Sequence, residues 1–213
     1  MIRIVSVNKG DKAYLQQGKD KIVTGIYKKP ILGRTTISAL GLAGDTICDT
    51  RHHGGPDQAV YAYFQEDYDW WNGQVGKNWG AGTFGENLTI RGVENTHMSI
   101  GDTLVFPDLE LQVTAPRIPC LTLAACMNIE GFIKQFFDSE RPGVYLRVLR
   151  SGSVAQGERG EHHAYQADKI SIRQFFTDAL KKLSVAEMER YLALPIDARS
   201  RKRFESKISL RQC

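Results

Sequence analysis

The chain of 213 residues is long enough for one large domain, or for one domain with a small appendage. With 42% hydrophobic residues, 24% charged residues and a net charge of +4, its composition is that of a soluble globular protein. No run of about 18 apolar residues occurs, which excludes a transmembrane helix and predicts no membrane partner. The first residues alternate as in a strand and lack the apolar core of a signal peptide, so we expect a cytoplasmic protein.

Residues 1–160 contain many short segments of strand length, rich in β-branched and aromatic side chains and separated by glycine turns. The predicted strands are residues 2–7, 22–27, 35–40, 59–64, 87–90, 109–114 and 144–149. Two predicted helices interrupt them, over residues 66–75 and over residues 121–137 with a break at Gly131. Many strands with few helices favour a mainly β fold with helices, built as a barrel or closed sheet.

The character of the chain changes near residue 165. Residues 165–213 carry 11 Lys and Arg against 6 Asp and Glu, a net charge of +5, which leaves −1 for residues 1–164. Apolar spacing predicts a helix over residues 170–183, Ser184 and Glu187 form a capping-box pattern that starts a second helix through Leu194, and residues 196–210 can form a third. We therefore predict a barrel of residues 1–164 followed by a small, basic helical domain of residues 165–213.

The four cysteines, at positions 48, 120, 126 and 213, form no C-x-x-C pair, so neither a zinc ribbon nor an iron–sulfur cluster is supported. Cys120 stands apart because it ends the segment Pro116-Arg-Ile-Pro-Cys120, in which two prolines stiffen the backbone. The neighbouring Arg117 favours the thiolate, the form that attacks electrophiles or binds soft metals. A buried cysteine in a strand-to-helix connection is the alternative interpretation.

Three further loops are polar and rich in glycine: residues 40–45, residues 51–59 and residues 84–88. In the second of them, Gly54 and Gly55 follow His53 and permit a backbone that binds anions. Arg51, His53 and Arg117 could then complement a phosphate group. Taken singly, each loop is equally compatible with an ordinary tight turn.

Seven motifs in this order and spacing resemble the MOSC domain family (molybdenum cofactor sulfurase C-terminal), and within it the YiiM-like subgroup. The motifs are Thr24-Gly-Ile-Tyr-Lys-Lys-Pro30, Gly41-Leu-Ala-Gly-Asp45, His53-Gly-Gly-Pro-Asp-Gln-Ala-Val60, Phe84-Gly-Glu-Asn-Leu88, Ile100-Gly-Asp102, Pro116-Arg-Ile-Pro-Cys120 and Gly143-Val-Tyr-Leu-Arg-Val148. The resemblance covers residues 20–160. The segment after them is similar to the three-helix C-terminal domain of that subgroup.

The resemblance implies a MOSC-type β-barrel that binds the molybdenum cofactor, a pyranopterin with a dithiolene-bound metal. It implies Cys120 as the ligand of the metal and Cys120 with His53 as the catalytic residues. The implied cofactor-binding residues are Lys28, Arg51, His53, Asn87, Arg117 and Cys120, with Arg141 as a weaker candidate. Of these, Arg117 would help to keep Cys120 ionised, and Arg51 would meet the phosphate. The helical segment is expected to contribute nothing to the metal centre.

The implied activity is the reduction of N-hydroxylated compounds such as 6-N-hydroxylaminopurine, which would detoxify such bases. Because the sequence has no iron–sulfur motif and no G-x-G-x-x-G fingerprint after a strand, electrons would come from a separate reductase protein, which the basic helices could dock. Two alternatives stay open: a carrier of the cofactor or of sulfur without turnover, and a thiol-dependent hydrolase or transferase using Cys120 and His53. A second copy of the chain, in a homodimer, is a further candidate partner, whereas nucleic acid is disfavoured.

Overall fold

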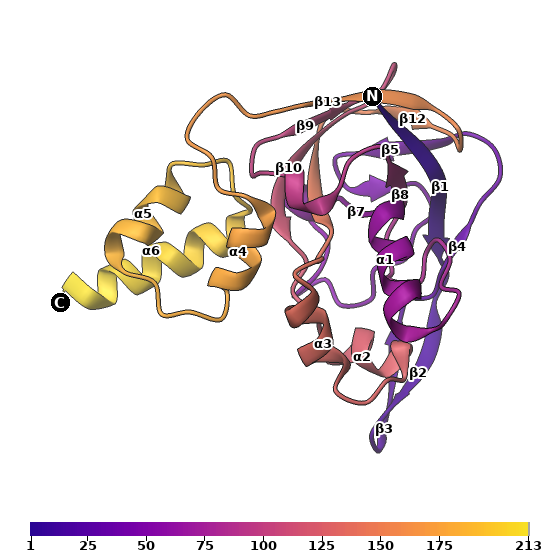
Figure 1. Ribbon diagram of the computed structural model, residues 1–213, viewed down its shortest axis with the longest axis horizontal. Helices are drawn as coiled ribbons and strands as arrows, with labels where there is room; N and C mark the ends of the chain where they lie inside the picture. Colours follow the sequence, from indigo (N-terminus) through magenta and orange to yellow (C-terminus); the bar gives the residue numbers. More distant parts are fainter. Residues whose placement is uncertain (213) are drawn as a thin grey trace.

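The structure, a computed structural model, describes residues 1–212. Its largest element is a closed sheet in the strand order β13-β9-β10-β11-β7-β8-β1, and the pairing of β1 with β13 completes the ring (Figure 1). The strands of this barrel are β1 (Ile2–Gly10), β7 (Val60–Phe64), β8 (Leu88–Arg91), β9 (Thr103–Val105), β10 (Glu110–Pro116), β11 (Val144–Arg150) and β13 (Arg159–His163). The predicted mainly β fold with a barrel is confirmed.

The barrel strands are antiparallel to their neighbours except for β7 and β8, which run parallel. A parallel pair needs a crossover connection, and the helix α1 (Gln65–Val75) provides part of it. Every residue of β7 is buried, as expected for a strand covered on both faces. In β1, buried Ile2 and Ile4 flank exposed Arg3, and a bulge after Ile4 then shifts this alternation.

Smaller strands surround the barrel. The short strand β4 (Lys28–Pro30) extends the large sheet beyond β1, and β2 (Ala13–Gln17) pairs with β3 (Asp20–Thr24) in a hairpin that projects from the molecule (Figure 1). A three-stranded sheet consists of β12 (Gly152–Val154), β5 (Thr35–Ser38) and β6 (Gly41–Leu42). Two 3-10 turns, η1 (Pro56–Gln58) and η2 (Asn95–His97), lie in the connecting loops.

The predicted helix over residues 121–137 is two helices, α2 (Leu121–Met127) and α3 (Phe132–Ser139). The break begins before Gly131, because Asn128 adopts a left-handed conformation with φ 49° and ends α2. The second helix packs on α1 through aromatic rings. Trp71 stacks on Phe132 and Phe136 with ring centroids 6.0 and 6.3 Å apart, and this cluster covers one side of the barrel.

Three helices form the C-terminal segment: α4 (Ile172–Asp178), α5 (Val185–Leu192) and α6 (Ala198–Gln212). The predicted capping box is confirmed, since the Glu187 N–H donates to Ser184 Oγ and the Ser184 N–H donates to the Glu187 carboxylate. Phe175 and Phe204 both lie against Tyr191, with ring centroids 4.6 and 5.2 Å away, and form the centre of this segment.

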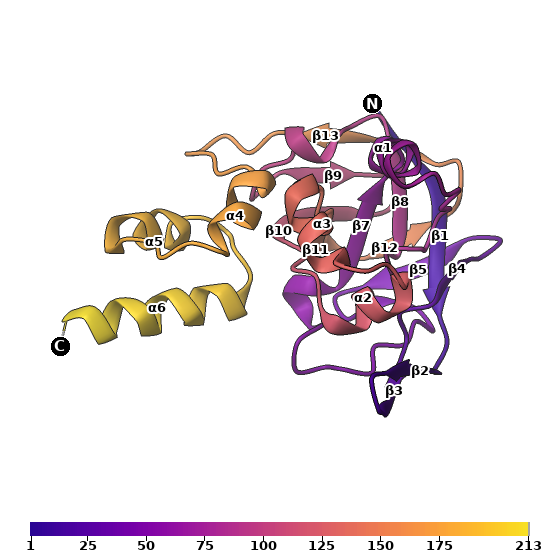
Figure 2. The ribbon, with the colours of Figure 1, turned by 60° about the horizontal axis from the view of Figure 1, so that its bottom comes forward.

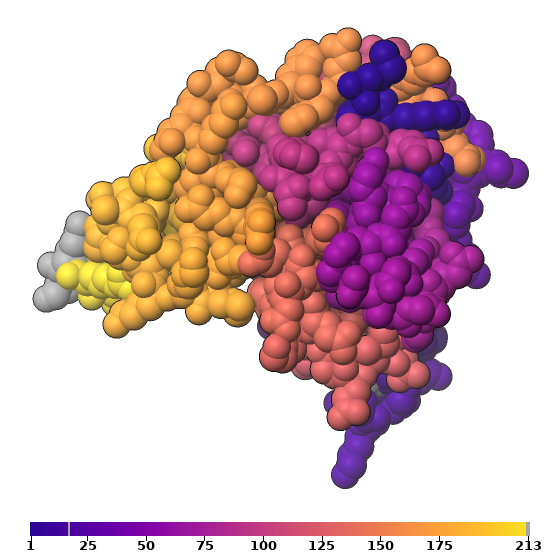
Figure 3. Space-filling view, viewed as in Figure 1, coloured from indigo at the N-terminus to yellow at the C-terminus, as the bar shows by residue number. Residues whose placement is uncertain are grey.

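The helical segment packs against the barrel part through apolar side chains. Phe176 of α4 stacks on Phe137 of α3 at 4.7 Å and meets Phe136 at 5.9 Å. The three helices lie on one side of the barrel (Figure 2), and the two parts form abutting lobes (Figure 3). Because the buried apolar side chains of both parts belong to one continuous cluster, a domain boundary at residue 165 stays a prediction. Within residues 1–212, no helix has both the length and the apolar character needed to cross a membrane.

Candidate functional site

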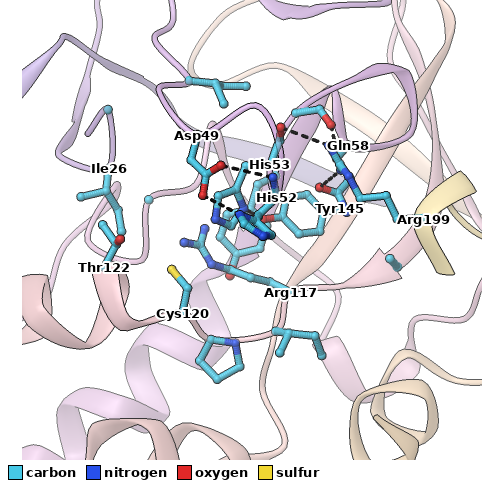
Figure 4. Close-up of a pocket in the computed structure, with 18 of the residues that line it drawn as sticks. Ile26, Asp49, His52, His53, Gln58, Arg117, Cys120, Thr122, Tyr145 and Arg199 are labelled. Atoms are coloured by element: carbon cyan, nitrogen blue, oxygen red, sulfur yellow. Dashed lines mark hydrogen bonds and ion pairs between the residues drawn. The ribbon is translucent and has the colours of Figure 1, made fainter. Parts of the chain in front are cut away.

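A cavity of about 580 Å³ lies between the barrel, the loop before β7 and the C-terminal helices. This volume is typical of a small-molecule site. Five of the six predicted cofactor-binding residues line it: Lys28, His53, Asn87, Arg117 and Cys120. The sixth, Arg51, is exposed and is not among the lining residues, so the structure does not bring it to the other five. Figure 4 shows how the central side chains lie.

Cys120 is held at the junction between β10 and α2. The strand β10 ends at Pro116, and Cys120 is the extended N-cap residue of α2, with φ −112° and ψ 165°. Its Sγ accepts a hydrogen bond from the Leu123 N–H at 3.4 Å. The thiol therefore faces the cavity from the connection between β10 and α2. Pro119 restricts the backbone conformation of Ile118, the residue before it.

The surroundings of Cys120 favour its thiolate form. Burial raises the pKa of this thiol, but interaction with the His53 side chain, the charge of Arg117 and the Leu123 N–H together outweigh burial and lower the pKa to about 6. Burial raises the pKa of the neighbouring Cys126 and keeps that residue a thiol. Cys120 is thus ionised at neutral pH, which is the state that binds soft metals or attacks electrophiles. Cys213 lies outside the described residues.

Arg117 is a buried cation with an unused donor. The residue is 5% exposed, and its guanidinium lies 4.8 Å from the centre of the Tyr61 ring. Its Nε is buried and has no hydrogen-bond partner among residues 1–212. An unpaired buried donor costs about 1–3 kcal/mol, so the site gains if an anionic ligand accepts this hydrogen bond.

His53 connects Cys120 to Tyr145. The His53 Nδ1 lies 3.2 Å from the Tyr145 hydroxyl, and burial raises the pKa of that hydroxyl, so Tyr145 stays protonated. The turn after His53 requires glycine at position 54, where φ is 70° and a Cβ atom would lie 2.9 Å from Ile47 Cδ1. Cys120, Arg117, His53 and Tyr145 therefore form one cluster that combines a thiolate, a fixed cation, an imidazole and a protonated phenol.

Lys28 and Asn87 are both bound to Asp45. The Lys28 Nζ lies 2.6 Å from Asp45 Oδ1, and the side chains of this pair are 7% and 5% exposed. Asn87 Nδ2 donates to Asp45 Oδ2 at 2.9 Å, while Asn87 Oδ1 accepts from the Tyr61 N–H at 3.2 Å. Burial lowers the pKa of Lys28 more than Asp45 raises it. Both predicted residues thus build the wall of the cavity.

Replacing Asp45 with alanine should destabilise the protein by about 3–5 kcal/mol, because Lys28 would be left as an unpaired buried charge. The measurement is the free energy of unfolding in urea. The matched control is Asp138→Ala, which breaks an exposed pair with Lys134 whose side chains are 59% and 81% exposed. That loss should not exceed about 0.5 kcal/mol. Equal losses in the two variants would contradict a structural role for the Lys28–Asp45 pair.

One other sequence candidate, Arg141, lies elsewhere. Arg141 forms an ion pair with buried Asp67, and its guanidinium is 4.9 Å from the Trp70 ring centre, so it supports α1 and does not line the cavity. His52 lines the cavity but pairs with Asp49 at 2.9 Å in an exposed position. Within residues 1–212, no three His, Cys, Asp or Glu side chains are grouped in a way that could hold a metal ion.

The C-terminal segment also lines the cavity, while the expectation that it contributes nothing to the metal centre stays a prediction. The residues are Phe175, Ala179, Asp197, Arg199, Ser200 and Arg203. No local pattern in the sequence indicated this, because the contact joins segments more than 140 residues apart, such as Arg199 and Gly54. Tyr145, by contrast, lies within the seventh quoted motif and could have been selected as a polar residue in a barrel strand.

The chain is similar to several known proteins. The MOSC domain family matches residues 49–161. Protein YflK of Bacillus subtilis (strain 168) is 33% identical over 154 residues, which is 72% of this chain and 70% of YflK. Protein YiiM of Escherichia coli (strain K12) is 29% identical over 135 residues, 62% of this chain and 60% of that protein. A protein of Gibberella moniliformis (strain M3125 / FGSC 7600) named reductase is 30% identical over 142 residues, 65% of this chain but only 25% of its own length.

The similarity to a solved structure extends over nearly the whole chain. The crystal structure of YiiM from Geobacillus stearothermophilus superposes with a TM-score of 0.80 at 25% identity and covers 98% of this chain and 100% of that chain. The superposition therefore includes the barrel and the three C-terminal helices. The chain belongs to the MOSC domain family, and within that family it is a YiiM-like protein.

Proposed function

We propose that the protein binds the molybdenum–pyranopterin cofactor in this cavity, with Cys120 Sγ as a ligand of the metal, and that it reduces N-hydroxylated compounds. The observation that carries this proposal is the ionised Cys120 beside the buried cation Arg117, whose Nε lacks a partner among residues 1–212. Membership of the MOSC domain family, which is associated with molybdenum-cofactor enzymes, supports the choice of cofactor.

The residues present fit such a group. A thiolate is the ligand type that sulfur-bound metals accept, and Cys120 is ionised at neutral pH. Arg117 offers a buried charge and an unused donor to an anionic cofactor, and Arg203 of α6 adds an exposed cation at the cavity wall. When bound, the cofactor would supply two-electron redox chemistry at its metal.

The chain itself would hold and protonate the reactants. Reduction of a hydroxylamine group to an amine and water consumes two electrons and two protons. His53, bonded to the Tyr145 hydroxyl and adjacent to Cys120, is the titratable group placed to deliver a proton to the departing hydroxyl oxygen. Arg117 would compensate the negative charge of Cys120 and of the cofactor throughout.

Part of the exposed edge of the cavity is apolar and suits a flat ring. Val23, Ile118 and Leu121 line the cavity, and their side chains are 39%, 42% and 64% exposed. Large apolar side chains left exposed at the edge of a polar pocket mark a binding surface for an apolar or aromatic ligand. A hydroxylated purine such as 6-N-hydroxylaminopurine has such a ring and carries the N-hydroxyl group that the polar cluster would reduce.

Replacing Leu121 with glutamine should raise KM for 6-N-hydroxylaminopurine roughly tenfold and leave kcat nearly unchanged, because apolar contact with the ring is the same before and during the reaction. The control is Leu210→Gln, which alters a side chain of α6 that is 79% exposed and does not line the cavity. Steady-state kinetics with both variants provide the measurement. An unchanged KM in Leu121→Gln would remove this residue from the substrate surface.

The electrons would come from a separate reductase protein. The sequence contains neither an iron–sulfur cysteine motif nor a dinucleotide fingerprint after a strand. A protein named reductase is similar to this chain over 25% of its own length. A cytoplasmic location, where such a donor would be available, stays a prediction.

A single-turnover experiment tests the function. Metal-loaded protein is reduced with dithionite under anaerobic conditions, freed of excess reductant and mixed with 6-N-hydroxylaminopurine. We expect one amine formed per molybdenum atom. Absence of amine from fully loaded, reduced protein would favour a carrier of the cofactor, and full activity in molybdenum-free protein would favour a thiol-dependent enzyme using Cys120 and His53.

A further inference from the structure

The loop that carries His53 is held by one side chain of the C-terminal helix α6. We call residues 50–58 the His53 loop. The Arg199 guanidinium donates four hydrogen bonds to this loop. Figure 4 shows Arg199 beside Gln58 and near His53. The acceptors are Gly54 O at 3.0 Å, Gln58 Oε1 at 2.8 Å, Thr50 O at 3.3 Å and His53 O at 3.3 Å.

The His53 loop has few constraints of its own. Its hydrogen bonds from backbone to backbone are His53 N to Asp49 O and Gln58 N to Gly55 O, both 3.0 Å. Side chains outside the loop add two more: the His52 N–H donates to Asp49 Oδ1 at 3.3 Å, and Thr114 Oγ1 donates to Asp57 O at 2.6 Å. Within the described part of the chain, the carbonyl oxygens of Thr50, His53 and Gly54 accept hydrogen bonds only from Arg199. Since a partly buried carbonyl group needs a partner, Arg199 satisfies Gly54 O, and its exposed hydrogen bonds to Thr50 O and His53 O add to its hold on this loop conformation.

Arg199 is itself fixed in place by contacts of the first turn of α6. The Ala198 N–H donates to Asp57 Oδ2 at 2.8 Å, and Asp57 Oδ1 lies 3.1 Å from Arg147 Nε. Arg147 also donates to the carbonyl oxygens of Pro195 and Ile196 at 3.0 and 2.9 Å. Because Arg147 belongs to β11 and Asp57 to the His53 loop, the start of α6 is tied to both the barrel and the loop.

We propose that Arg199 is a positioning residue for the site: by binding the His53 loop, it keeps the His53 imidazole against Tyr145 and Cys120. The helix α6 then contributes a residue that positions His53 in the site. A guanidinium has five donors in a fixed plane, whereas the ammonium of lysine is a compact group that cannot reach four separate acceptors. The consequence for turnover rests on the proposed function, but the placement of His53 does not.

The test compares Arg199→Ala and Arg199→Lys with Arg201→Ala in the full chain. Arg201 lies on the same helix and donates to the carbonyl oxygens of Leu192 and Leu194 at 2.9 and 2.8 Å, so its contacts stay within the helical segment. Two readouts use metal-free protein: amide hydrogen exchange in the His53 loop, and the ¹⁵N resonances of the His53 ring, assigned with His53→Ala.

In Arg199→Ala, we expect the amide hydrogens of the His53 loop to exchange roughly tenfold faster than in the wild type and the His53 ring resonances to shift. Arg201→Ala should change neither the exchange rates nor the resonances. Arg199→Lys retains the charge and most of the bulk of the side chain, and it should behave like Arg199→Ala. If Arg199→Ala does not fold, Arg199→Lys is the variant that tests the proposal. In metal-loaded protein, kcat should fall about 10- to 100-fold, which is the typical loss when a residue that orients a group of a metal site is replaced. The change in KM should be smaller.

Wild-type loop exchange and wild-type His53 resonances in a folded Arg199 variant would overturn the proposal. Equal changes in Arg201→Ala would also overturn it, because they would show a general loosening of the helices. If wild-type protein fails to reduce N-hydroxylated compounds, the proposed function fails, while hydrogen exchange and the ring resonances still decide the role of Arg199.

Discussion

Replacing Cys120 with alanine should abolish the reduction of N-hydroxylated compounds and lower molybdenum retention by more than about 100-fold. This loss exceeds the one caused by replacing residues that only orient the ligands of a metal. The reason is that Cys120 is the cavity thiol with a lowered pKa, about 6, and would be the protein's ligand to the metal. The fold should persist, because Cys120 is only partly buried and its Sγ accepts one long hydrogen bond. Molybdenum per chain and turnover are the quantities to measure.

Cys126→Ala is the matched control for this prediction. Cys126 lies on the same helix and is partly buried, but burial raises its pKa and it does not line the cavity. This variant should keep its molybdenum and its activity and lose about 1 kcal/mol of stability, since a small side chain is removed from a packed site. Wild-type turnover in Cys120→Ala with a full complement of metal would show that the ligand assignment is wrong.

The alkylation of Cys120 should titrate with a midpoint near pH 6 in metal-free protein and shift to higher pH when Arg117 or His53 is replaced. Burial alone raises the pKa of this thiol, and the interaction with His53 and the charge of Arg117 are what lower it to about 6. Arg117→Met keeps the volume but removes the charge, and His53→Ala removes the imidazole. The measurement is the rate of reaction with iodoacetamide between pH 4 and pH 10.

The sign of the stability effect follows from the same pKa. Because the folded pKa of Cys120 is about 6 and an unfolded cysteine has a pKa of about 8.5, the thiolate contributes its full stability above pH 8.5. This contribution is lost as the pH falls through 6. Cys126 reacts in the same samples at higher pH and is the internal reference. A wild-type midpoint at 8.5 for Cys120 would contradict the described electrostatics.

Local patterns were sufficient to predict most of the fold. The strands predicted over residues 109–114 and 144–149 correspond to β10 (Glu110–Pro116) and β11 (Val144–Arg150), and the capping box at Ser184 starts α5. These features depend on neighbours in the sequence, such as alternating apolar residues and a cap. The predicted break at Gly131 is confirmed, but it begins three residues earlier, because Asn128 also adopts a left-handed conformation.

The site was only partly predictable. Cys120 and Arg117 could be identified because they lie in one rigid segment, and His53 because two glycines follow it. Arg51 was predicted to meet the phosphate because it lies close to His53 in the sequence, but it does not line the cavity, whereas Arg199 of α6 does. The ion pair between Lys28 and Asp45 could not be predicted from the sequence either, because the two residues are 17 positions apart and meet only in the folded barrel. Contacts between distant segments leave no periodic signal in a single sequence.

The amount of molybdenum and pterin bound by the purified protein tests the central claim most directly. The protein is produced in a host that makes the cofactor, and the metal is measured by elemental analysis and the pterin by its fluorescence after denaturation. One molybdenum atom and one pterin per chain in the wild type, both lost in Cys120→Ala and retained in Cys126→Ala, is the predicted result. Protein that reduces 6-N-hydroxylaminopurine at full rate without molybdenum or pterin would contradict the account.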